Sequence, residues 1–390
     1  MPDKAFLIVS LSGRVLAKAA ARSGRPAVGV DVFADRDTCG LTLEWARVPL
    51  DPDWNMEPAA MLAAADAICP KDRCLGLVYG SGFEARPDLL RRLAESRPLL
   101  GNTPEVLETV ANPTRFFALL EQLGIPHPLV SAQRPTPQVG WLSKKAGASG
   151  GVHVRLASTQ TGDKAGRYFQ RAVLGENWSL LFLANGQGVC PVGFNRALPT
   201  PSQAPGSWSY AGAIRQAQAP ALIGEAVVDA ARALTCNLGL KGLNGLDFII
   251  TDTGWTLLEL NPRPTATLEL WDVPPLPPLF DLHMQACLGR LPVLLPRPEG
   301  AMAVAVTYAE TTIRVPASFP WPNWSADLPQ VGCVLQMGEP VCTVHAEGAD
   351  VTEVEQQVLE RRQAILDRLA LFRPGDNCHP PSHETQAAVA

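Results

Sequence analysis

The chain has 390 residues, of which 46% are hydrophobic and 18% charged, and its formal net charge is −5. This composition is enough to bury two or three domain cores. The absence of a basic block argues against a nucleic-acid partner, and no apolar run approaches the roughly 20 residues that cross a bilayer. Nine scattered cysteines without a Cys-x-x-Cys pair, and a start without a secretory leader, predict reduced thiols and a cytoplasmic protein.

Apolar runs and helical stretches alternate over the first hundred residues. We expect strands at Ala5–Ser10, Ala27–Phe33 and Leu75–Tyr79, and helices at Arg14–Arg22, Pro58–Ile68 and Pro87–Ala94. This alternation predicts a parallel sheet with helices on its faces. Ligands of such sheets bind beyond the carboxyl ends of the strands, here Ser10–Arg14, Asp31 and Gly80–Gly82. Asp31 would suit a dinucleotide ribose, but the Gly-x-Gly-x-x-Gly sequence is absent after the first strand, which disfavours that interpretation.

A small β-rich lobe follows a predicted helix, Thr114–Leu123, and a proline-rich connector. In this lobe a short strand ends in Lys144 and Lys145, a loop of small residues follows, and Val152–Arg155 alternates like a strand. Glycines let backbone N–H groups approach anionic oxygens, and a lysine adds a point charge. The stretch therefore predicts a phosphate cradle. No Gly-x-x-x-x-Gly-Lys-Ser/Thr sequence occurs, so the cradle is not a P-loop.

The same loop also fits the nucleophile elbow of serine hydrolases, because Gly147-Ala-Ser149-Gly-Gly151 matches Gly-x-Ser-x-Gly. Asp247 and His283 follow in the expected order. An elbow needs a helix directly after the serine, whereas the sequence predicts a strand there. The hydrolase would also leave the acidic pair described next without a role.

A hairpin is predicted after a weakly patterned segment, Leu198–Pro220, and a helix, Leu222–Leu238. Its strands are Leu246–Ile250 and Trp255–Leu260, and its loop is Asp252–Gly254, with Gly254 in the left-handed conformation. This register places Asp247 opposite Glu259. Asn261 shares their face, and the residues pointing to the other face are Phe248, Ile250, Leu258 and Leu260.

Two opposed carboxylates with Cβ atoms about 5 Å apart repel each other unless a cation lies between them. Magnesium prefers carboxylate and carbonyl oxygens and is usually shared with substrate phosphates. Asp247, Glu259 and Asn261 are therefore predicted to bind Mg²⁺, with Mn²⁺ as a substitute. A solvated acidic edge is the alternative interpretation.

The last part of the chain is predicted to begin with a helix, Pro277–Leu288, and to end with another, Thr352–Leu371. His345 lies between them and is interpreted as a strand residue rather than a catalyst. Residues 373–390 are rich in Pro, His and Ser and are predicted to be disordered.

The lysine–glycine cradle and the Asp…Glu-x-Asn hairpin together resemble the ATP-grasp superfamily, and the Asn-Pro-Arg ending resembles its carboxylate–amine ligases. The resemblance implies an α/β (α+β) fold with an N-terminal, Rossmann-like pre-ATP-grasp domain at 1–110. An ATP-grasp domain would follow at 111–298, with its nucleotide-covering lobe at about 139–195. A small antiparallel element like that of biotin carboxylases would occupy 299–372.

The resemblance also implies which residues bind ATP. Lys144, Gly150 and Gly151 would contact the phosphates. Tyr168–Gly175 resembles the hinge that hydrogen-bonds adenine, through Gln170 and Val173, although a glutamate is commoner at Gln170. The ribose would contact Glu176 or Asn177. Arg115 lies two positions from the usual basic residue and is either a phosphate ligand or a solvated helix charge.

The activity implied is ATP-dependent joining of a carboxylate to an amine through an acyl phosphate, with release of ADP and phosphate. Lys144 and Arg263 would be catalytic. Gly13, Arg14 and Gly82 are substrate-side candidates, with ordinary loop residues as the alternative. The implied partners are small-molecule carboxylates and amines, and a homodimer is common among such relatives.

The whole-chain pattern looks most like predicted ligases linked to tetrahydromethanopterin and methanofuran coenzymes. It therefore implies addition of an amino acid such as glutamate to a coenzyme precursor of one-carbon metabolism. Two alternatives remain. The displaced Arg115 and the missing hinge acid would suit a nucleotide-binding regulator without catalysis, and Ser149 would suit the hydrolase.

Overall fold

The N-terminal part is a parallel sheet covered by helices, as the sequence predicts. The computed structural model describes residues 4–51, 54–159, 165–216 and 219–372, and the predicted tail, 373–390, lies outside them. The strands are β1 (Ala5–Val9), β2 (Ala27–Asp31), β3 (Glu44–Arg47) and β4 (Cys74–Tyr79), in the order β3-β2-β1-β4. The helices are α1 (Arg14–Arg22), α2 (Arg36–Leu41), α3 (Pro58–Ile68) and α4 (Pro87–Ala94). The predicted bounds of α1, α3 and α4 are confirmed.

Two of these elements, α2 and β3, escaped the sequence analysis. The helix α2 has only six residues, and the strand β3 has only four, none of which is buried. Neither element is long enough to show a clear hydrophobic period. Beyond the sheet, α5 (Pro104–Ala111) was also missed, and α6 (Pro113–Gln122) begins one residue before its predicted start. The Asn112 side chain caps α6 by accepting a hydrogen bond from the backbone N–H of Arg115 at 3.1 Å.

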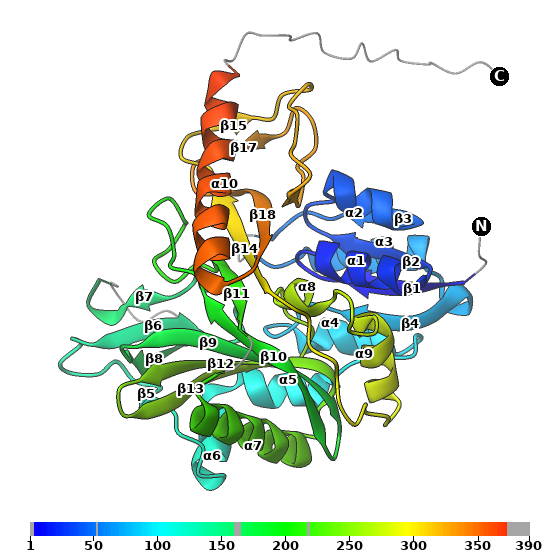
Figure 1. Ribbon diagram of the computed structural model, residues 1–390. Coiled ribbons are helices and arrows are strands. Elements are labelled where there is room, and N and C mark those ends of the chain that lie inside the picture. The colour runs from blue at the N-terminus through cyan, green and yellow to red at the C-terminus, as the bar shows by residue number, and fades with distance from the viewer. Residues whose placement is uncertain (1–3, 52–53, 160–164, 217–218, 373–390) are drawn as a thin grey trace.

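The small lobe is a separate sheet of four antiparallel strands. These are β5 (Val130–Ser131), β6 (Trp141–Lys145), β7 (Arg155–Leu156) and β8 (Arg167–Arg171), in the order β5-β8-β6-β7. The predicted strand over Val152–Val154 is wrong, because Val152 and His153 form a turn and β7 begins only at Arg155. The lobe lies at one end of the molecule in Figure 1, beside the edge of the larger sheet.

An eight-stranded sheet forms the centre of the molecule and runs β13-β12-β9-β10-β11-β14-β18-β16. Its strands are β9 (Glu176–Asn185), β10 (Val189–Ala197), β11 (Gly212–Gln216), β12 (Lys241–Thr251), β13 (Gly254–Asn261), β14 (Ala301–Tyr308), β16 (Ser325–Ala326) and β18 (Pro340–Gly348). The sequence analysis missed β11 because its residues are mostly small or polar. That strand pairs with both β10 and β14, so the hairpin strands and the C-terminal strands belong to one continuous sheet.

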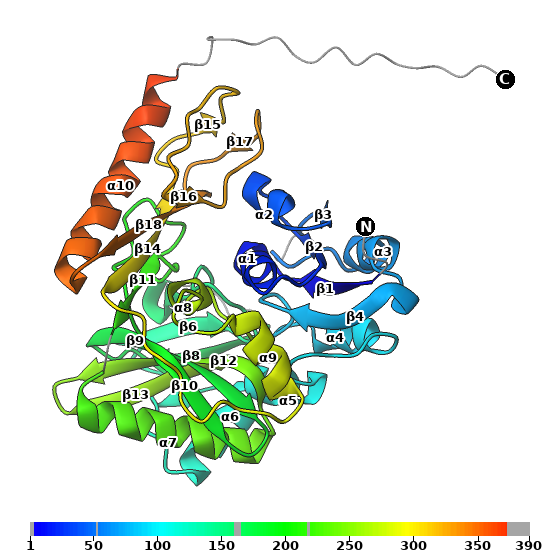
Figure 2. The same ribbon diagram turned by 45° about the vertical axis from the view of Figure 1, so that its right-hand side comes forward.

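Helices cover both faces of this sheet (Figure 1 and Figure 2). On one face lie α6 and α7 (Ala221–Leu238), and on the other lie α8 (Leu268–Trp271) and α9 (Leu279–Cys287). At the C-terminal end, α10 (Val351–Leu371) packs on β14 and β18, and β15 (Ile313–Arg314) pairs with β17 (Val334–Leu335). Within the described residues, every helix is too short or too polar to cross a bilayer.

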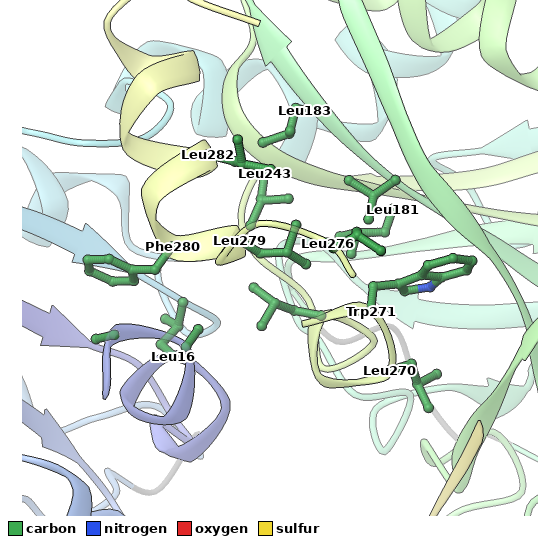
Figure 3. Packing of buried hydrophobic residues seen from close by; sticks show 14 of the residues in the cluster. Leu16, Leu181, Leu183, Leu243, Leu270, Trp271, Leu276, Leu279, Phe280 and Leu282 are labelled. Carbon is green, nitrogen blue, oxygen red and sulfur yellow. The ribbon is translucent and has the colours of Figure 1, made fainter. Parts of the chain in front are cut away.

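One hydrophobic core joins the N-terminal sheet to the central sheet. Figure 3 shows Leu16 of α1 and Phe280 of α9 within it, together with Trp271 of α8. The rings of Phe6 and Phe280 meet edge to face with centroids 5.5 Å apart. Because one core spans both sheets, the loops that follow β1 and β4 are held in a fixed position beside the hairpin end of the central sheet.

His283 on α9 makes this junction sensitive to acid. Its Nδ1 accepts a hydrogen bond from the Leu243 N–H at 2.9 Å, and its Nε2 lies 3.0 Å from the Leu100 carbonyl oxygen. These partners require a neutral ring, and burial lowers the pKa of His283 from 6.5 to about 4. The unfolded chain takes up this proton first as the pH falls.

We therefore expect stability to be complete above pH 6.5 and to decline between pH 6.5 and pH 4, by at most about 3 kcal/mol from His283. Urea unfolding at pH 7 and pH 5 measures the loss. His283→Gln should reduce the difference between the two pH values, whereas His127→Gln, near the surface, should leave it nearly unchanged. An equal pH dependence in both variants would contradict the assignment.

Candidate active site

The hairpin β12–β13 brings Asp247 opposite Glu259, as predicted, but by a different route. The turn has two residues rather than three, since Thr251 pairs with Gly254, which has φ +148°. A β-bulge between Asp247 and Phe248 then restores the register, because Phe248 pairs with Leu257 and leaves the next residue unpaired. The predicted orientation of Leu258 is therefore wrong: Leu257 is the fully buried residue, and Leu258 lines a cavity.

Asp247 and Glu259 form a partly buried acidic pair that shares a hydrogen bond. Burial, followed by the neighbouring charge of Glu259, raises the pKa of Asp247 well above its usual range. Burial alone would raise the pKa of Glu259 too, but the charge of Lys144 and the hydrogen bond from Asp247 outweigh it and lower that pKa. A proton shared by the pair is therefore held more strongly by Asp247 than by Glu259.

Asn261 and Arg263 continue the face of this acidic pair. Asn261 donates a hydrogen bond from Nδ2 to Asp247 Oδ2 at 2.8 Å and accepts one at Oδ1 from Arg263 at 3.0 Å. Arg263 is 8% exposed and also pairs with Glu84, from the loop after β4. The Gly82 N–H donates to the other Glu84 oxygen at 2.8 Å. The hairpin and the N-terminal sheet thus meet through one ionic contact.

The residues of the hairpin fit a magnesium ion. Asp247 and Glu259 offer carboxylate oxygens, and the amide oxygen of Asn261 keeps a second lone pair beside its bond to Arg263. Binding of the ion would release the proton that the acidic pair shares. No cluster of three or more His, Cys, Asp or Glu side chains suited to a metal occurs in the described residues, and the amide of Asn261 would add a neutral oxygen to the two carboxylates.

The loop after β6 needs its glycines. Gly147, Gly150 and Gly151 all have positive φ, between +69° and +75°. A Cβ on Gly151 would lie 1.7 Å from the Trp208 carbonyl oxygen, and one on Gly147 would lie 2.8 Å from the Cα of Ala85. The loop is therefore packed between the N-terminal domain and the segment before β11, and only glycine fits there.

Lys144 lies at the edge of this loop and faces the acidic pair. It is 8% exposed, it donates a hydrogen bond from Nζ to Gln170 Oε1 at 2.8 Å, and its charge is the main influence lowering the pKa of Glu259. The structure thus brings the lysine, the glycine loop and the acidic hairpin together from separate parts of the chain. Their side chains could hold a phosphate chain with its cation.

A small cavity lies between these elements, with about 60 Å³ of open space. Its lining comes from four regions, represented by Glu84, Phe117, Gly147, His153, Glu259 and Asn261. Pockets for drug-sized ligands measure roughly 300–1,000 Å³, so entry of a nucleotide requires the glycine loop to move outward. His153 lies in the stretch that was predicted to alternate like a strand, but it lines this cavity, and burial lowers its pKa to about 4.

The residues that line the cavity include none of the seven predicted nucleotide residues, which are Lys144, Gly150, Gly151, Gln170, Arg115, Val173 and Glu176. Arg115 is exposed on α6, which favours the solvated helix charge over the phosphate ligand. Val173 lies in the short connection between β8 and β9 and is partly buried. Glu176 is exposed at the start of β9, where its carboxylate accepts a hydrogen bond from the Trp178 indole at 3.1 Å.

The predicted substrate residues of the N-terminal domain are divided between two places. Gly82 is next to Glu84 and therefore near the cavity. Gly13 donates its N–H to Asp31 Oδ2 at 3.0 Å, and Asp31 also accepts from two backbone groups of its own loop, so it has a structural role rather than a ribose contact. Arg14 is 2% exposed and engaged by acidic side chains, so it is not free to hold a substrate.

Arg14 belongs to a buried ionic network between three parts of the fold. It contacts Glu269 at 2.8 Å and Asp327 at 2.6 Å, and His345 Nε2 lies 2.7 Å from the other Glu269 oxygen. His345 lies in β18, as predicted for a strand residue. Burial would raise the pKa of Glu269, but Arg14 and then His345 lower it. The carboxylate is therefore ionised and doubly paired.

The serine hydrolase arrangement is not assembled. Ser149 lines the cavity, but the ring nitrogens of His283 are occupied by backbone groups of Leu243 and Leu100, and His283 is absent from that lining. No helix follows Ser149, whose loop continues into a turn. The triad therefore lacks its base.

Replacing Ser149 with alanine provides a direct check. Since no base activates this hydroxyl, we expect Ser149→Ala to keep nucleotide-dependent turnover within about tenfold of the parent chain, far from the loss of a nucleophile. Steady-state phosphate release measures it. Complete loss of turnover with retained nucleotide binding would favour the hydrolase.

The comparison with known families decides the identity of the central region. Residues 110–267 match the family model described as an ATP-grasp domain. These residues form an ATP-grasp domain. The match contains the small lobe, the glycine loop and the whole acidic hairpin. No protein of curated function matches the sequence.

Solved structures show that the ATP-grasp fold extends beyond the matched residues. L-amino acid ligase from Bacillus licheniformis has a TM-score of 0.66 at 13% identity, covering 95% of this chain and 98% of its own. N5-carboxyaminoimidazole ribonucleotide synthetase from Thermotoga maritima has a TM-score of 0.66 at 12% identity, and the match covers 92% of this chain and 98% of the synthetase. A third similar structure is the biotin carboxylase domain of Hydrogenobacter thermophilus 2-oxoglutarate carboxylase, in complex with MgADP, ADP and bicarbonate. Its TM-score is 0.67 at 12% identity, and the match covers 91% of this chain and 89% of that domain.

Sequence reasoning missed two polar residues, Glu84 of the cavity lining and Tyr210 near the acidic hairpin. Glu84 follows the predicted loop Gly80–Gly82 at the carboxyl end of a strand, so the rule for parallel sheets could have found it. Tyr210 has no such signal, because it lies in the weakly patterned segment. Its hydroxyl is buried without a hydrogen-bond partner, and the charges of Glu269 and Asp247 act on it after burial to raise its pKa.

Proposed function

We propose that this protein is an ATP-dependent ligase that joins a carboxylate to an amine. One observation carries the proposal: within an ATP-grasp domain, Lys144 and the glycine loop lie beside the Asp247–Glu259 pair, and a small cavity separates the loop from Glu259. A phosphate chain needs cations and backbone N–H groups on one side and a metal site on the other, and this cavity offers both. L-amino acid ligase from Bacillus licheniformis has the same fold over nearly the whole chain.

In the proposed reaction, the substrate carboxylate attacks the γ-phosphorus of ATP in line. The bond to the β-phosphate oxygen breaks, ADP leaves with the electron pair, and an acyl phosphate forms. Lys144 and the loop amides at Gly150 and Gly151 hold the phosphates in position, while magnesium bound by the hairpin would neutralise phosphate charge. Because positioning supplies the rate, no nucleophilic side chain is required.

The amine then attacks the acyl carbon, and phosphate leaves. Arg263 is held at the cavity edge by Glu84 and Asn261, and it keeps a positive charge where the oxyanion and the departing phosphate develop. The glycine loop excludes water, which would otherwise hydrolyse the acyl phosphate. Gly82 lies next to Glu84 and borders the side from which the substrates would arrive.

The finer assignments are part of the proposal. The adenine edge would face Gln170 and Val173, and Glu176 would reach the ribose. Domain boundaries at 110, 298 and 372 fit the sheets, although β11 and β14 pair across the second boundary. Free thiols at all described cysteines suit a cytoplasmic location, and a homodimer is proposed from the relatives, one of which is a biotin carboxylase domain dimer.

The substrates proposed are an amino acid such as glutamate and a coenzyme precursor of the tetrahydromethanopterin or methanofuran type. The support is the Asn261-Pro262-Arg263 ending, which resembles ligases of that group. The regulator alternative is favoured by one observation, the exposure of Arg115 away from the cavity. The complete set of hairpin oxygens favours catalysis.

A pooled assay tests the proposal. The full chain is incubated with ATP, Mg²⁺ and pools of carboxylates and amines, and phosphate release is measured. Release that requires one member of each pool supports the ligase and identifies its substrates. Tight ATP binding without release from any pair would support the regulator, and failure to bind any nucleotide would refute both.

A further inference from the structure

Gln170 is buried in the nucleotide lobe with half of its hydrogen-bonding capacity unused. Its side chain is 1% exposed, and its Nε2 atom has no hydrogen-bond partner. A buried amide nitrogen without a partner destabilises the folded protein, so such atoms are rare unless a ligand satisfies them. Two N–H donors of Gln170 are therefore available to a bound molecule.

Lys144 fixes which end of this amide is available. Its Nζ lies 2.8 Å from Gln170 Oε1, and an ammonium group can only donate. The carbonyl oxygen must therefore point to Lys144, and the nitrogen must point away. Rotating the amide by half a turn would place two donors against each other, so the end of Gln170 that points away from Lys144 is the nitrogen with its two donors.

Strand pairing places this amide on the same face of the small lobe as a residue of the cavity. In the β6–β8 pair, Leu142 lies opposite Gln170 and Lys144 lies opposite Tyr168, so all four side chains share one face. Of these four, Tyr168 lines the cavity, and Glu259 is among its other lining residues. Gln170 is one step farther from the glycine loop along the same strand, in the stretch that the proposed function assigns to the adenine base.

The two common purines differ in what they present to such a group. The edge of guanine that carries N7 offers two acceptors, N7 and O6, whereas adenine offers the N7 acceptor beside an amino donor. A glutamate would accept from the adenine amino group and repel a 6-oxo group. An amide locked with its donors outward has the opposite preference, although N7 of either purine can still accept from it.

We propose that Gln170 is a base-specificity residue that makes this site accept 6-oxopurine nucleoside triphosphates alongside ATP. The inference rests on the proposed function and refines it, since it concerns the base of the nucleotide that the ligase consumes. Inosine triphosphate is the clean probe because it carries the 6-oxo group without the 2-amino group of guanosine triphosphate.

Calorimetric titration of the full chain with ATP and with inosine triphosphate, each with excess Mg²⁺, tests the inference without any knowledge of the substrates. We expect the parent chain to bind the two nucleotides within about tenfold of each other. Gln170→Glu should shift the ratio at least about tenfold toward ATP, a change of 1.4 kcal/mol in relative binding free energy. Guanosine triphosphate then reports the added effect of a 2-amino group.

Two further variants control the experiment. Gln133→Glu adds the same charge at an exposed position of the same lobe and should leave the ratio unchanged. Gln170→Met removes the donors without adding charge and should also lower inosine triphosphate binding relative to ATP. If nucleotides bind with a ratio that neither Gln170 variant changes, the inference is wrong and the ligase proposal stands. If no purine nucleotide binds, both the inference and the ligase proposal are wrong.

Discussion

Replacing Glu259 with glutamine is expected to lower the rate of nucleotide-dependent phosphate release at least about 10²–10³-fold, the scale for losing one preorganised electrostatic contact at a transition state. The substitution keeps the size of the side chain but removes the carboxylate that Lys144 holds ionised opposite Asp247. A neutral amide would also weaken binding of the cation. Steady-state kinetics with titrated Mg²⁺ would show the lower kcat and the higher metal requirement.

The matched control for this variant is Glu225→Gln, which removes the same charge from an exposed position on α7. It should retain the parent rate. Binding of Mn²⁺, followed by its electron spin resonance signal with nucleotide present, gives a readout apart from turnover. If Glu259→Gln kept normal ligation and normal Mn²⁺ affinity, the hairpin would not be the metal site.

Replacing Arg14 with methionine is expected to reduce the free energy of unfolding by about 3–5 kcal/mol, the range for breaking a buried ion pair. Among the described residues, the variant would leave the buried Glu269 with His345 as its one ion-pair partner, and would leave Asp327 without its arginine. Glu269 would retain the cost of burial and lose most of its compensation, whereas Asp327, whose side chain is 24% exposed, would lose less. Urea unfolding at pH 7 measures the effect.

Arg25→Met is the comparison, because Arg25 is 48% exposed and its pair with Asp281 is worth less than about 1 kcal/mol. Adding Glu269→Gln to the Arg14 variant should recover part of the lost stability, since it removes the unpaired charge. A loss below 1 kcal/mol in Arg14→Met would show that the network does not hold the three parts together.

Long elements with clear periodicity could be predicted from the sequence. The bounds of α1, α3 and α4 were correct to the residue, since a proline begins α3 and α4 and an apolar face at helical spacing marks α1. β11 could not be predicted, because a strand of Gly, Ala, Ile, Arg and Gln carries no alternating pattern. Only its pairing with β10 and β14 reveals it.

The opposition of Asp247 and Glu259 was predicted correctly through two errors that cancel. Local sequence does not distinguish a three-residue turn from a two-residue turn followed by a bulge, because both place Asp247 opposite Glu259. The two registers differ by one residue in every pair between the bulge and the turn, and packing against the core decides that Leu257 rather than Leu258 turns inward. The ion pairs of Arg14 could not be predicted from local sequence, since its acidic partners lie 255 and 313 residues away along the chain.

The packing of the glycine loop against its neighbours affects the order in which the reactants can bind. Gly147 abuts the backbone at Ala85, one residue beyond the Glu84 that pairs with Arg263, and Gly151 abuts Trp208. A nucleotide that lifts this loop must part it from the N-terminal domain as well. Loading of the nucleotide and access of the second reactant are therefore mechanically linked, so each should alter the apparent Michaelis constant of the other.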